Sequence, residues 1–145
     1  MPSLVCVDAS LAVRWVVPED YSDQALDLLA FWGESQTELV APTHMLYEVN
    51  STLRFLVSQK VISEEIGDGA FSHFRRLRIR LTSRAAIFPL AWSLARELNQ
   101  PTTYDTVYLA LARMLNCELW TADRKFFAAA RTQAPEVKWI GDYRA

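Results

Sequence analysis

The chain has 145 residues, a formal net charge of −2, and a composition that is 51% hydrophobic and 22% charged. This length suits one globular domain with a substantial core, and the composition excludes an intrinsically disordered chain. The slightly acidic balance provides no overall positive field, so a nucleic acid would have to meet a local basic patch or a bound metal ion. We therefore expect a single domain over residues 1–145.

No stretch approaches the roughly 18 uncharged apolar residues of a membrane span, and the N-terminus lacks the pattern of a signal peptide. The two cysteines, Cys6 and Cys117, lie in apolar runs without CxxC spacing. They are typical of small buried residues in a reduced compartment. We therefore expect a cytoplasmic protein that makes no membrane contact.

In chain order, the first half of the chain predicts two strands among amphipathic helices. The apolar run over residues 3–7 indicates a buried strand, and a helical pattern follows over 10–16. Ser22 is expected to cap a second helix, which Gly33 ends. The remaining predicted elements of this half are a strand over 38–41, a helix over 43–58 and a helix over 63–75.

The second half of the chain opens with a different pattern. Residues 77–82 place Arg78 and Arg80 between apolar residues, an alternation typical of an edge strand. The elements predicted after it are helices over 85–99 and 103–115, a strand over 117–121, a helix over 124–132 and a strand over 137–140. Strands separated by helices throughout predict an α/β fold, with a mainly parallel sheet, helices on both faces and right-handed crossovers.

Four acidic residues carry the chemical signal: Asp8, Glu48, Asp105 and Asp123. Asp8 and Asp123 each follow a predicted strand, and such strand ends line one crevice in an open α/β sheet. Glu48 and Asp105 lie near helix starts amid apolar residues, where a buried charge persists only if it is paired or bound to metal. Because carboxylates in one crevice repel one another, a hard cation such as Mg²⁺ or Mn²⁺ is expected between them. This arrangement indicates metal-assisted phosphoryl chemistry.

Each of the four acids also has a simpler interpretation when it is taken alone. Asp8 and Asp123 precede helices and are well placed as N-caps. Asp105 follows Thr102 by three residues, which is a variant of the capping box, and Glu48 fits a solvated helix position. Only the four acids together favour a functional site.

Other polar side chains near these acids have supporting roles in this interpretation. The hydroxyls of Ser10 and Thr121 are expected to hydrogen-bond and orient a carboxylate, with helix capping and strand-end positions as the alternative. Arg14 and Arg124 are expected near the mouth of the crevice, where a guanidinium can steer a phosphate.

At four segments the chain resembles the PIN-domain family, and within it the VapC-type ribonuclease toxins of toxin–antitoxin pairs. The matching segments are Val7-Asp8-Ala9-Ser10, Tyr47-Glu48-Val49-Asn50, residues 103–112 and residues 119–124. Their order and separation fit the family, and the resemblance spans nearly the whole chain. The last two segments, together with an Asp in the first strand, are the most specific part of the resemblance.

The resemblance implies a three-layer α/β/α domain with a mainly parallel five-stranded sheet. It also implies Mg²⁺- or Mn²⁺-dependent endoribonuclease activity on RNA, and a homodimer inhibited by a cognate antitoxin. By position, Asp8, Glu48, Asp105 and Asp123 match the catalytic, metal-binding acids of the family. Some members carry a further acid shortly after the last one, whereas residues 124–127 contain none here, which leaves the number of bound metals open.

The expected reaction is metal-assisted hydrolysis, in which a cation lowers the pKa of a water that attacks the phosphorus in line. Asp105 or Asp123 would accept the proton, and the products would carry 5′-phosphate and 3′-hydroxyl ends. A metal-free ribonuclease would need acid–base side chains such as histidine. His44 and His73 each stand alone on a predicted helix, and we expect both to be structural or surface residues.

Rival functions are weaker on sequence grounds. A phosphatase of the haloacid dehalogenase type needs a second Asp two residues after the first, where this chain has Ser10. A dinucleotide-binding module needs a glycine-rich turn after the first strand, which is missing here. A non-catalytic domain of the same fold that only binds RNA or a protein partner stays open as an alternative.

Two surface questions also stay open at this stage. The arginine-rich segment 74–80 suits either an RNA contact or a solvated edge that prevents aggregation. Several aromatic residues exceed what the helix packing requires, and some of them are candidates for a dimer or antitoxin face. These aromatic residues are Trp15, Phe31, Trp32, Phe55, Phe71 and Phe74.

Overall fold

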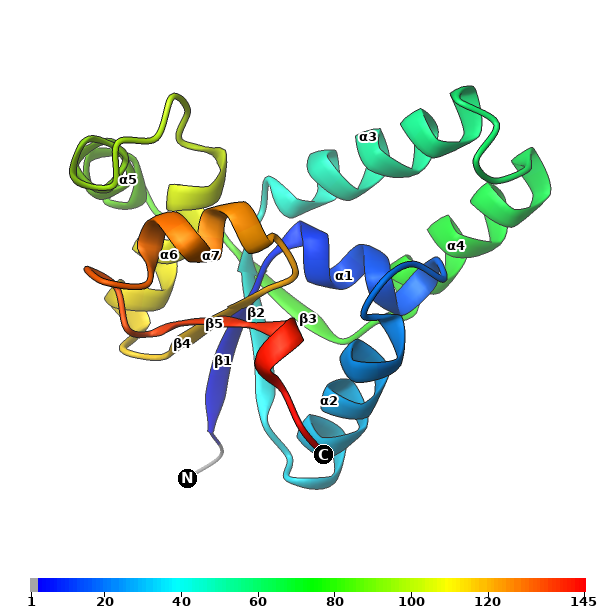
Figure 1. The fold of residues 1–145 in the computed structure, drawn as a ribbon, viewed down its shortest axis with the longest axis horizontal. Coiled ribbons are helices and arrows are strands. Elements are labelled where there is room, and N and C mark those ends of the chain that lie inside the picture. Colours follow the sequence, from blue (N-terminus) through cyan, green and yellow to red (C-terminus); the bar gives the residue numbers. More distant parts are fainter. Residues whose placement is uncertain (1–2) are drawn as a thin grey trace.

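A computed structural model describes residues 3–145, and it contains a five-stranded parallel sheet between two layers of helices (Figure 1). The strand order is β3-β2-β1-β4-β5, and each neighbouring pair is parallel. This confirms the predicted three-layer α/β/α fold and places the arginine-bearing strand at an edge of the sheet. The strands are β1 (Leu4–Val7), β2 (Glu38–Pro42), β3 (Ile79–Thr82), β4 (Glu118–Thr121) and β5 (Val137–Trp139).

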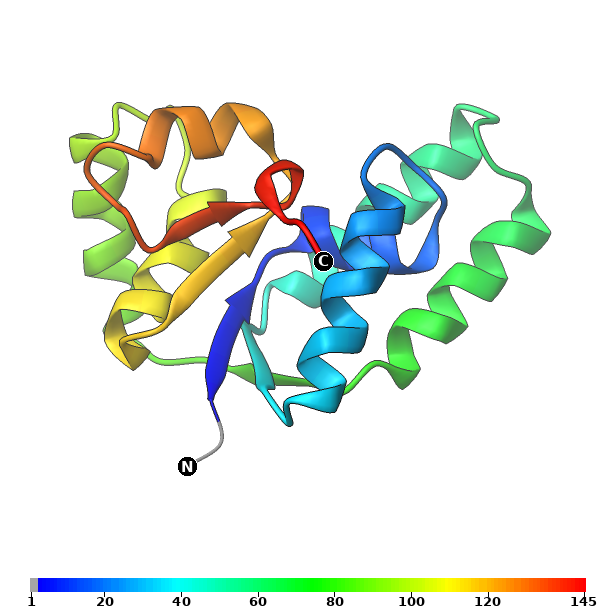
Figure 2. The same cartoon turned by 60° about the horizontal axis from the view of Figure 1, so that its bottom comes forward.

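Right-handed crossovers place helices on opposite faces of a sheet when the strand order changes direction, as it does here at β1. Helices α1 and α2 lie on one side of the sheet, with α3 and α4 packed on α1 and projecting beyond it, and α5, α6 and α7 lie on the other side (Figures 1 and 2). Among residues 3–145, no helix is both long enough and apolar enough to cross a membrane. The helices are α1 (Ala9–Val16), α2 (Ser22–Glu34), α3 (Met45–Ser58), α4 (Glu64–Arg76), α5 (Ile87–Glu97), α6 (Tyr104–Leu115), α7 (Arg124–Ala130) and the short 3₁₀ helix η1 (Ile140–Asp142).

The order in which the chain adds strands to the sheet changes direction between β1 and β4, although all strands stay parallel. From β1 the chain continues outward to β2 and β3, and it then returns to β4 and β5 on the other side. Val7 pairs with Trp120 in this register, and the Asp8 amide donates to the Trp120 carbonyl at 3.3 Å. The carboxyl ends of β1 and β4 therefore meet at the topological switch point, where ligands bind in open α/β sheets.

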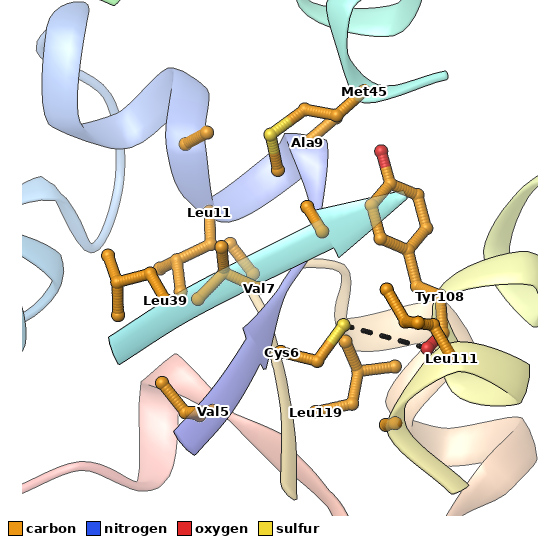
Figure 3. Packing of buried hydrophobic residues seen from close by; sticks show 14 of the residues in the cluster. Val5, Cys6, Val7, Ala9, Leu11, Leu39, Met45, Tyr108, Leu111 and Leu119 are labelled. Carbon is orange, nitrogen blue, oxygen red and sulfur yellow. Dashed lines mark hydrogen bonds between the residues drawn. The ribbon is translucent and has the colours of Figure 1, made fainter. Parts of the chain in front are cut away.

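The core lies on both sides of β1. Cys6 is fully buried, and its thiol donates to the Tyr108 carbonyl at 3.6 Å, which joins the strand to α6 (Figure 3). Leu111 and Leu119 pack close to this contact (Figure 3). Because α6 also carries two buried alanines, Ala110 and Ala112, its backbone can lie close to the sheet. This close packing fixes the start of α6, where Asp105 is located.

The predicted cap of the second helix is wrong. Ser22 is the first residue of α2, and Tyr21 occupies the N-cap position in a left-handed conformation with φ of 69°. The buried Ser22 hydroxyl accepts from the Glu19 amide at 2.9 Å and donates to the Val17 carbonyl at 3.2 Å. It therefore closes the turn between α1 and α2. Gly33 lies inside α2, which extends to Glu34.

The capping box predicted from Thr102 and Asp105 is also absent. Helix α6 begins at Tyr104, and its N-cap residue Thr103 makes no side-chain capping bond. Within the described chain, the Asp105 carboxylate accepts no hydrogen bond. Some elements are shorter than predicted: α5 covers Ile87–Glu97, and β5 ends at Trp139 because the next residue begins a short 3₁₀ helix.

The surplus aromatic residues separate into two groups. Trp15, Trp32 and Phe74 are buried, whereas Phe31, Phe55 and Phe71 are exposed. A helical repeat alone does not distinguish them, because the width of the buried stripe depends on which neighbours cover the helix.

Candidate active site

All four predicted acids line one pocket of about 240 Å³ at the switch point. Asp8 follows β1, Asp123 follows β4, Glu48 lies in the first turn of α3, and Asp105 lies in the first turn of α6. The sheet supplies the first pair and helices on opposite faces supply the second pair. Four segments far apart in the sequence therefore converge on one crevice.

Asp8 is the most firmly held of the four carboxylates. Its Oδ1 accepts from the Ser10 hydroxyl at 2.7 Å and from the Leu11 amide at 3.0 Å, and its Oδ2 accepts from the Thr121 hydroxyl. Burial raises the pKa of Asp8 to about 6, against these hydrogen bonds, which lower it, and with a further increase from the charge of Asp123. Asp8 is thus both the N-cap of α1 and a buried wall of the pocket.

The hydroxyls of Ser10 and Thr121 also tie the two strand ends together. Ser10 Oγ accepts from the Ala122 amide at 2.9 Å, and Thr121 Oγ1 accepts from the Asp123 amide at 3.0 Å. Each hydroxyl therefore donates to Asp8 and accepts from the segment that leads to Asp123. A side chain that connects both acids in this way fixes their relative position.

Asp105 is the acid whose ionisation the pocket disfavours most. Its pKa is raised to about 7, first by burial and then by the charges of Asp8, Asp123 and Glu48, while His44 lowers it. The carboxylates therefore interact electrostatically, as the sequence interpretation required. Near neutral pH and without a cation, Asp105 holds a proton for part of the time.

Glu48 is held by an aromatic pair that the sequence interpretation missed. Its Oε1 accepts from the Tyr108 hydroxyl at 2.7 Å and lies 2.8 Å from His44 Nε2. The His44 and Tyr108 rings are 4.7 Å apart, and Figure 3 shows the Tyr108 hydroxyl directed towards the start of α3. Burial, followed by the charge and hydrogen bond of Glu48, raises the pKa of Tyr108 far above its ordinary value, so the hydroxyl stays a donor.

Signals for these two residues were present in the sequence. His44 and Glu48 are four residues apart, which places them on one helical face, and Tyr108 lies three residues after Asp105. His44 was expected to be structural or on the surface, but it contacts a pocket acid directly. His73 is exposed on α4, away from the pocket.

Asp123 joins the pocket while it also caps a helix. Its Oδ1 accepts from the Phe126 amide at 3.0 Å and so caps α7. Capping and a position in the pocket therefore coexist at Asp8 and Asp123. The two interpretations of these acids that the sequence left open are not exclusive.

The two predicted arginines differ in position. Arg14 lines the pocket, where it pairs with Glu19 at 3.5 Å and donates to the carbonyls of Ser10 at 2.9 Å and Asp20 at 3.2 Å. Arg124 does not line this pocket, because its guanidinium stacks over the Trp139 ring at 5.3 Å. Glu19, an acid that the sequence interpretation did not select, also lines the pocket.

The donor chemistry of the pocket fits a hard divalent cation. Carboxylate oxygens are the ligands that Mg²⁺ and Mn²⁺ prefer, and burial, followed by repulsion from the other acids, raises the pKa of Asp105. Across residues 3–145, no three His, Cys, Asp or Glu side chains yet lie close enough to form a ready ion site. The four acids therefore surround one pocket without forming a closed set of ion ligands in the described residues.

The comparisons with known proteins agree with this geometry. The PIN domain family model matches residues 7–138, and the chain therefore belongs to the PIN domain family. Its relatives include VapC ribonuclease Mb0985 of Mycobacterium bovis and Ribonuclease VapC9 of Mycobacterium tuberculosis. Each of these is 30% identical over 132 residues, which cover 91% of this chain and 95% of the relative.

Solved structures share the fold at lower sequence identity. The structure of Mycobacterium tuberculosis VapC20, a Sarcin-Ricin loop cleaving toxin, matches with a TM-score of 0.63 and 17% sequence identity. The match covers 86% of this chain and 94% of the VapC20 chain. The structure of VapBC2 from Rickettsia felis, bound to a DNA fragment from its promoter, matches with a TM-score of 0.65 and 16% sequence identity. The match covers 94% of this chain and 96% of the matched chain. These likenesses establish the fold.

Proposed function

We propose that this chain is a Mg²⁺- or Mn²⁺-dependent endoribonuclease and the toxin of a type II toxin–antitoxin pair. The observation that carries the proposal is the convergence of four carboxylates on one pocket at the β1/β4 switch point. The VapC ribonuclease relatives and the VapBC2 assembly support RNA as substrate and a cognate antitoxin as partner. The cytoplasm, where such RNA is found, is the proposed place of action.

In this proposal Asp8, Glu48, Asp105 and Asp123 supply the oxygen ligands. A bound Mg²⁺ or Mn²⁺ would lower the pKa of the attacking water and stabilise charge on the departing oxygen. Asp105 or Asp123 would accept the proton of that water.

The residues around the acids hold them in position. Ser10 and Thr121 orient Asp8, while Tyr108 and His44 orient Glu48. Arg14 is the proposed phosphate contact inside the pocket, and a substrate phosphate would compete with Glu19 for its guanidinium. Arg124 would have to leave the Trp139 ring to reach a substrate, so we assign it only a steering role at the rim.

Cleavage of a mixed RNA pool with Mn²⁺, with EDTA, and with the single variants Asp8→Asn, Glu48→Gln, Asp105→Asn and Asp123→Asn tests this function. We expect the natural chain to cleave RNA with Mn²⁺ and not with EDTA, and its products to carry 5′-phosphate and 3′-hydroxyl ends. Each variant should lose activity by about 100-fold or more. Undiminished cleavage in EDTA would reject the metal mechanism. Intact RNA with every ion would favour the non-catalytic alternative, and a phosphoenzyme would favour the phosphatase.

We also propose that the protein forms a homodimer through the face that joins α3, α5 and α6. Tyr47, Phe88, Trp92 and Tyr104 are each more than half exposed there, and three of them surround an apolar pocket of about 310 Å³. Exposed aromatic clusters of this kind mark interaction sites. Light scattering should give twice the chain mass for the natural protein, and the chain mass for Phe88→Glu combined with Trp92→Glu.

A further inference from the structure

A groove at the other end of the sheet has no role in the proposed reaction. It is a hollow of about 710 Å³ between the last turns of α2 and the starts of β2 and β3, which is much larger than the acid pocket of about 240 Å³. Its floor is formed by Leu29, Trp32, Leu39, Leu77 and Ile79. We call this hollow, together with the arginines beside it, the arginine groove.

The rim of the arginine groove is strongly basic although the whole chain is slightly acidic. Arg75, Arg76, Arg78 and Arg80 fall within six consecutive residues, and all four are exposed. Within residues 3–145 only Arg80 has a carboxylate partner, Glu38 at 3.0 Å. Arg78 and Arg80 line the hollow itself, and Arg76 ends α4 two residues before Arg78, so positive charge gathers on this side of the apolar floor.

The edge of the sheet runs along this groove. Strand β3 runs along the lower side of the molecule in Figure 2, above the turn between α2 and β2, and among residues 3–145 it pairs only with β2. The Thr82 carbonyl accepts from the Thr43 amide at 3.1 Å, so the alternation of a parallel strand directs the backbone of Arg80 towards β2 as well. The N–H and C=O of Leu81, a residue just past the lining of the groove, therefore point outward, where an extended segment that leaves the groove can bond to them.

The lining of the groove favours a protein segment over RNA. A single-stranded nucleic acid needs exposed aromatic faces on which its bases stack. Among residues 3–145, Trp32 is the one aromatic side chain that lines the groove, and it is only 6% exposed and meets Trp15 and Trp120 edge to face. An apolar floor under unpaired guanidinium groups instead matches aliphatic side chains that alternate with carboxylates.

We propose that the arginine groove binds an extended segment of a partner protein in which aliphatic and acidic residues alternate. The aliphatic side chains enter the hollow over the half-buried Leu29, Leu77 and Ile79, and the carboxylates meet Arg78 and, beside the hollow, Arg76. The groove and the acid pocket share no lining residue. The proposal therefore does not depend on the ribonuclease activity, and either can fail alone.

The structure provides a matched pair of variants for the test. Gly33 lines the groove and Gly69 lies on α4 outside it, and a Cβ at either position meets no atom within 4 Å. Gly33→Trp should fill the groove without disturbing the fold, and Gly69→Trp is its control. For charge, Arg76→Glu with Arg78→Glu removes the rim, and Arg96→Glu with Arg131→Glu makes the same change in net charge elsewhere.

The experiment is a selection of random dodecapeptides displayed on phage against the full chain, with counter-selection on Gly33→Trp. We expect enriched peptides rich in Asp, Glu and aliphatic residues. Synthetic copies should bind the natural chain and both control variants equally. They should bind Gly33→Trp and the Arg76/Arg78 variant about tenfold more weakly or worse.

Several results would overturn the proposal. One is a selection that yields no peptide, or peptides without an acidic excess. Another is equal binding of the selected peptides by Gly33→Trp. The third concerns an uncleavable RNA oligonucleotide. If both groove variants weaken its binding as strongly as they weaken peptide binding, the surface is an RNA contact.

Discussion

Thr121 shows how one small side chain supports two acids. Its hydroxyl donates to Asp8 and accepts from the Asp123 amide, and it is fully buried. Replacement by the isosteric valine keeps the packing but leaves a carboxylate oxygen and an amide without a partner. Sequence analysis selected Thr121 for its position at a strand end, and the structure adds the second of these bonds.

We expect Thr121→Val to lower the free energy of unfolding by about 1–3 kcal/mol, because buried polar groups lose their hydrogen bonds. It should also weaken Mn²⁺ binding by about 10- to 100-fold, since Asp8 loses the donor that orients it. Urea melts and calorimetric titration with Mn²⁺ measure the two effects. A variant that loses stability but keeps full Mn²⁺ affinity would restrict Thr121 to a structural role.

The raised pKa of Asp105 makes stability depend on pH. The folded protein, with a pKa of about 7 at this carboxyl, keeps a proton that the unfolded chain loses near the ordinary value of 3.8. Without divalent ions, stability should therefore fall as pH rises from about 4 to about 7, and Asp8 should add a similar fall up to about pH 6.

Urea melts in EDTA at about pH 4.5 and about pH 7.5 measure this dependence. Asp105→Asn should make stability depend less on pH. At the higher pH the variant should be at least as stable as the natural chain, because it removes the repulsion between Asp105 and the other acids. Mn²⁺ should stabilise only the natural chain strongly. If Asp105→Asn unfolds the domain, Asp105 is a structural residue and the site is wrong.

At the level of secondary structure, the helix starts bring the acids to the pocket. Asp8 and Asp123 cap α1 and α7, so the same geometry that satisfies the first turn also fixes each carboxylate at a strand end. Glu48 and Asp105 lie in the first turns of α3 and α6, where the helix dipole favours a negative charge.

Capping and catalysis at Asp123 can be separated by two substitutions. Asparagine caps a helix about as well as aspartate, whereas alanine does not. We expect Asp123→Asn to keep the stability of the natural chain, and Asp123→Ala to cost about 1 kcal/mol. Both should lose Mn²⁺-dependent cleavage. Ser63→Ala, which removes the cap of α4, should cost about as much stability but leave cleavage intact.

The two ends of the sheet divide the work of the molecule. The carboxyl ends of β1 and β4 hold the acids, and the starts of β2 and β3 hold the arginine groove. A net charge of −2 provides no general attraction for RNA, so local contacts decide its affinity.

The separation of these two ends predicts how cleavage responds to salt. The combination of Arg78→Gln and Arg80→Gln should leave the salt dependence of RNA cleavage unchanged, because neither arginine lines the acid pocket. Stability should change by less than about 0.5 kcal/mol, since the Arg80–Glu38 pair is exposed. A shallower salt slope in this variant would instead place the RNA on this edge.

The sequence by itself determined the alternation of strands and helices, and with it the parallel sheet and the edge position of Arg78 and Arg80. It also picked out the four acids, because two followed strands and two lay on apolar helix faces. These features are local, since hydrophobic periodicity and strand-end residues are visible within short windows.

Only the tertiary structure decided which groups meet. The contacts of Glu48 with Tyr108, of Arg14 with Glu19, and of Arg124 with Trp139 depend on how separate elements pack. The raised pKa of Asp105 has the same origin, because burial and three distant carboxylates produce it together. Such effects act between groups that are close in space and remote in sequence, so no short window of the chain contains them.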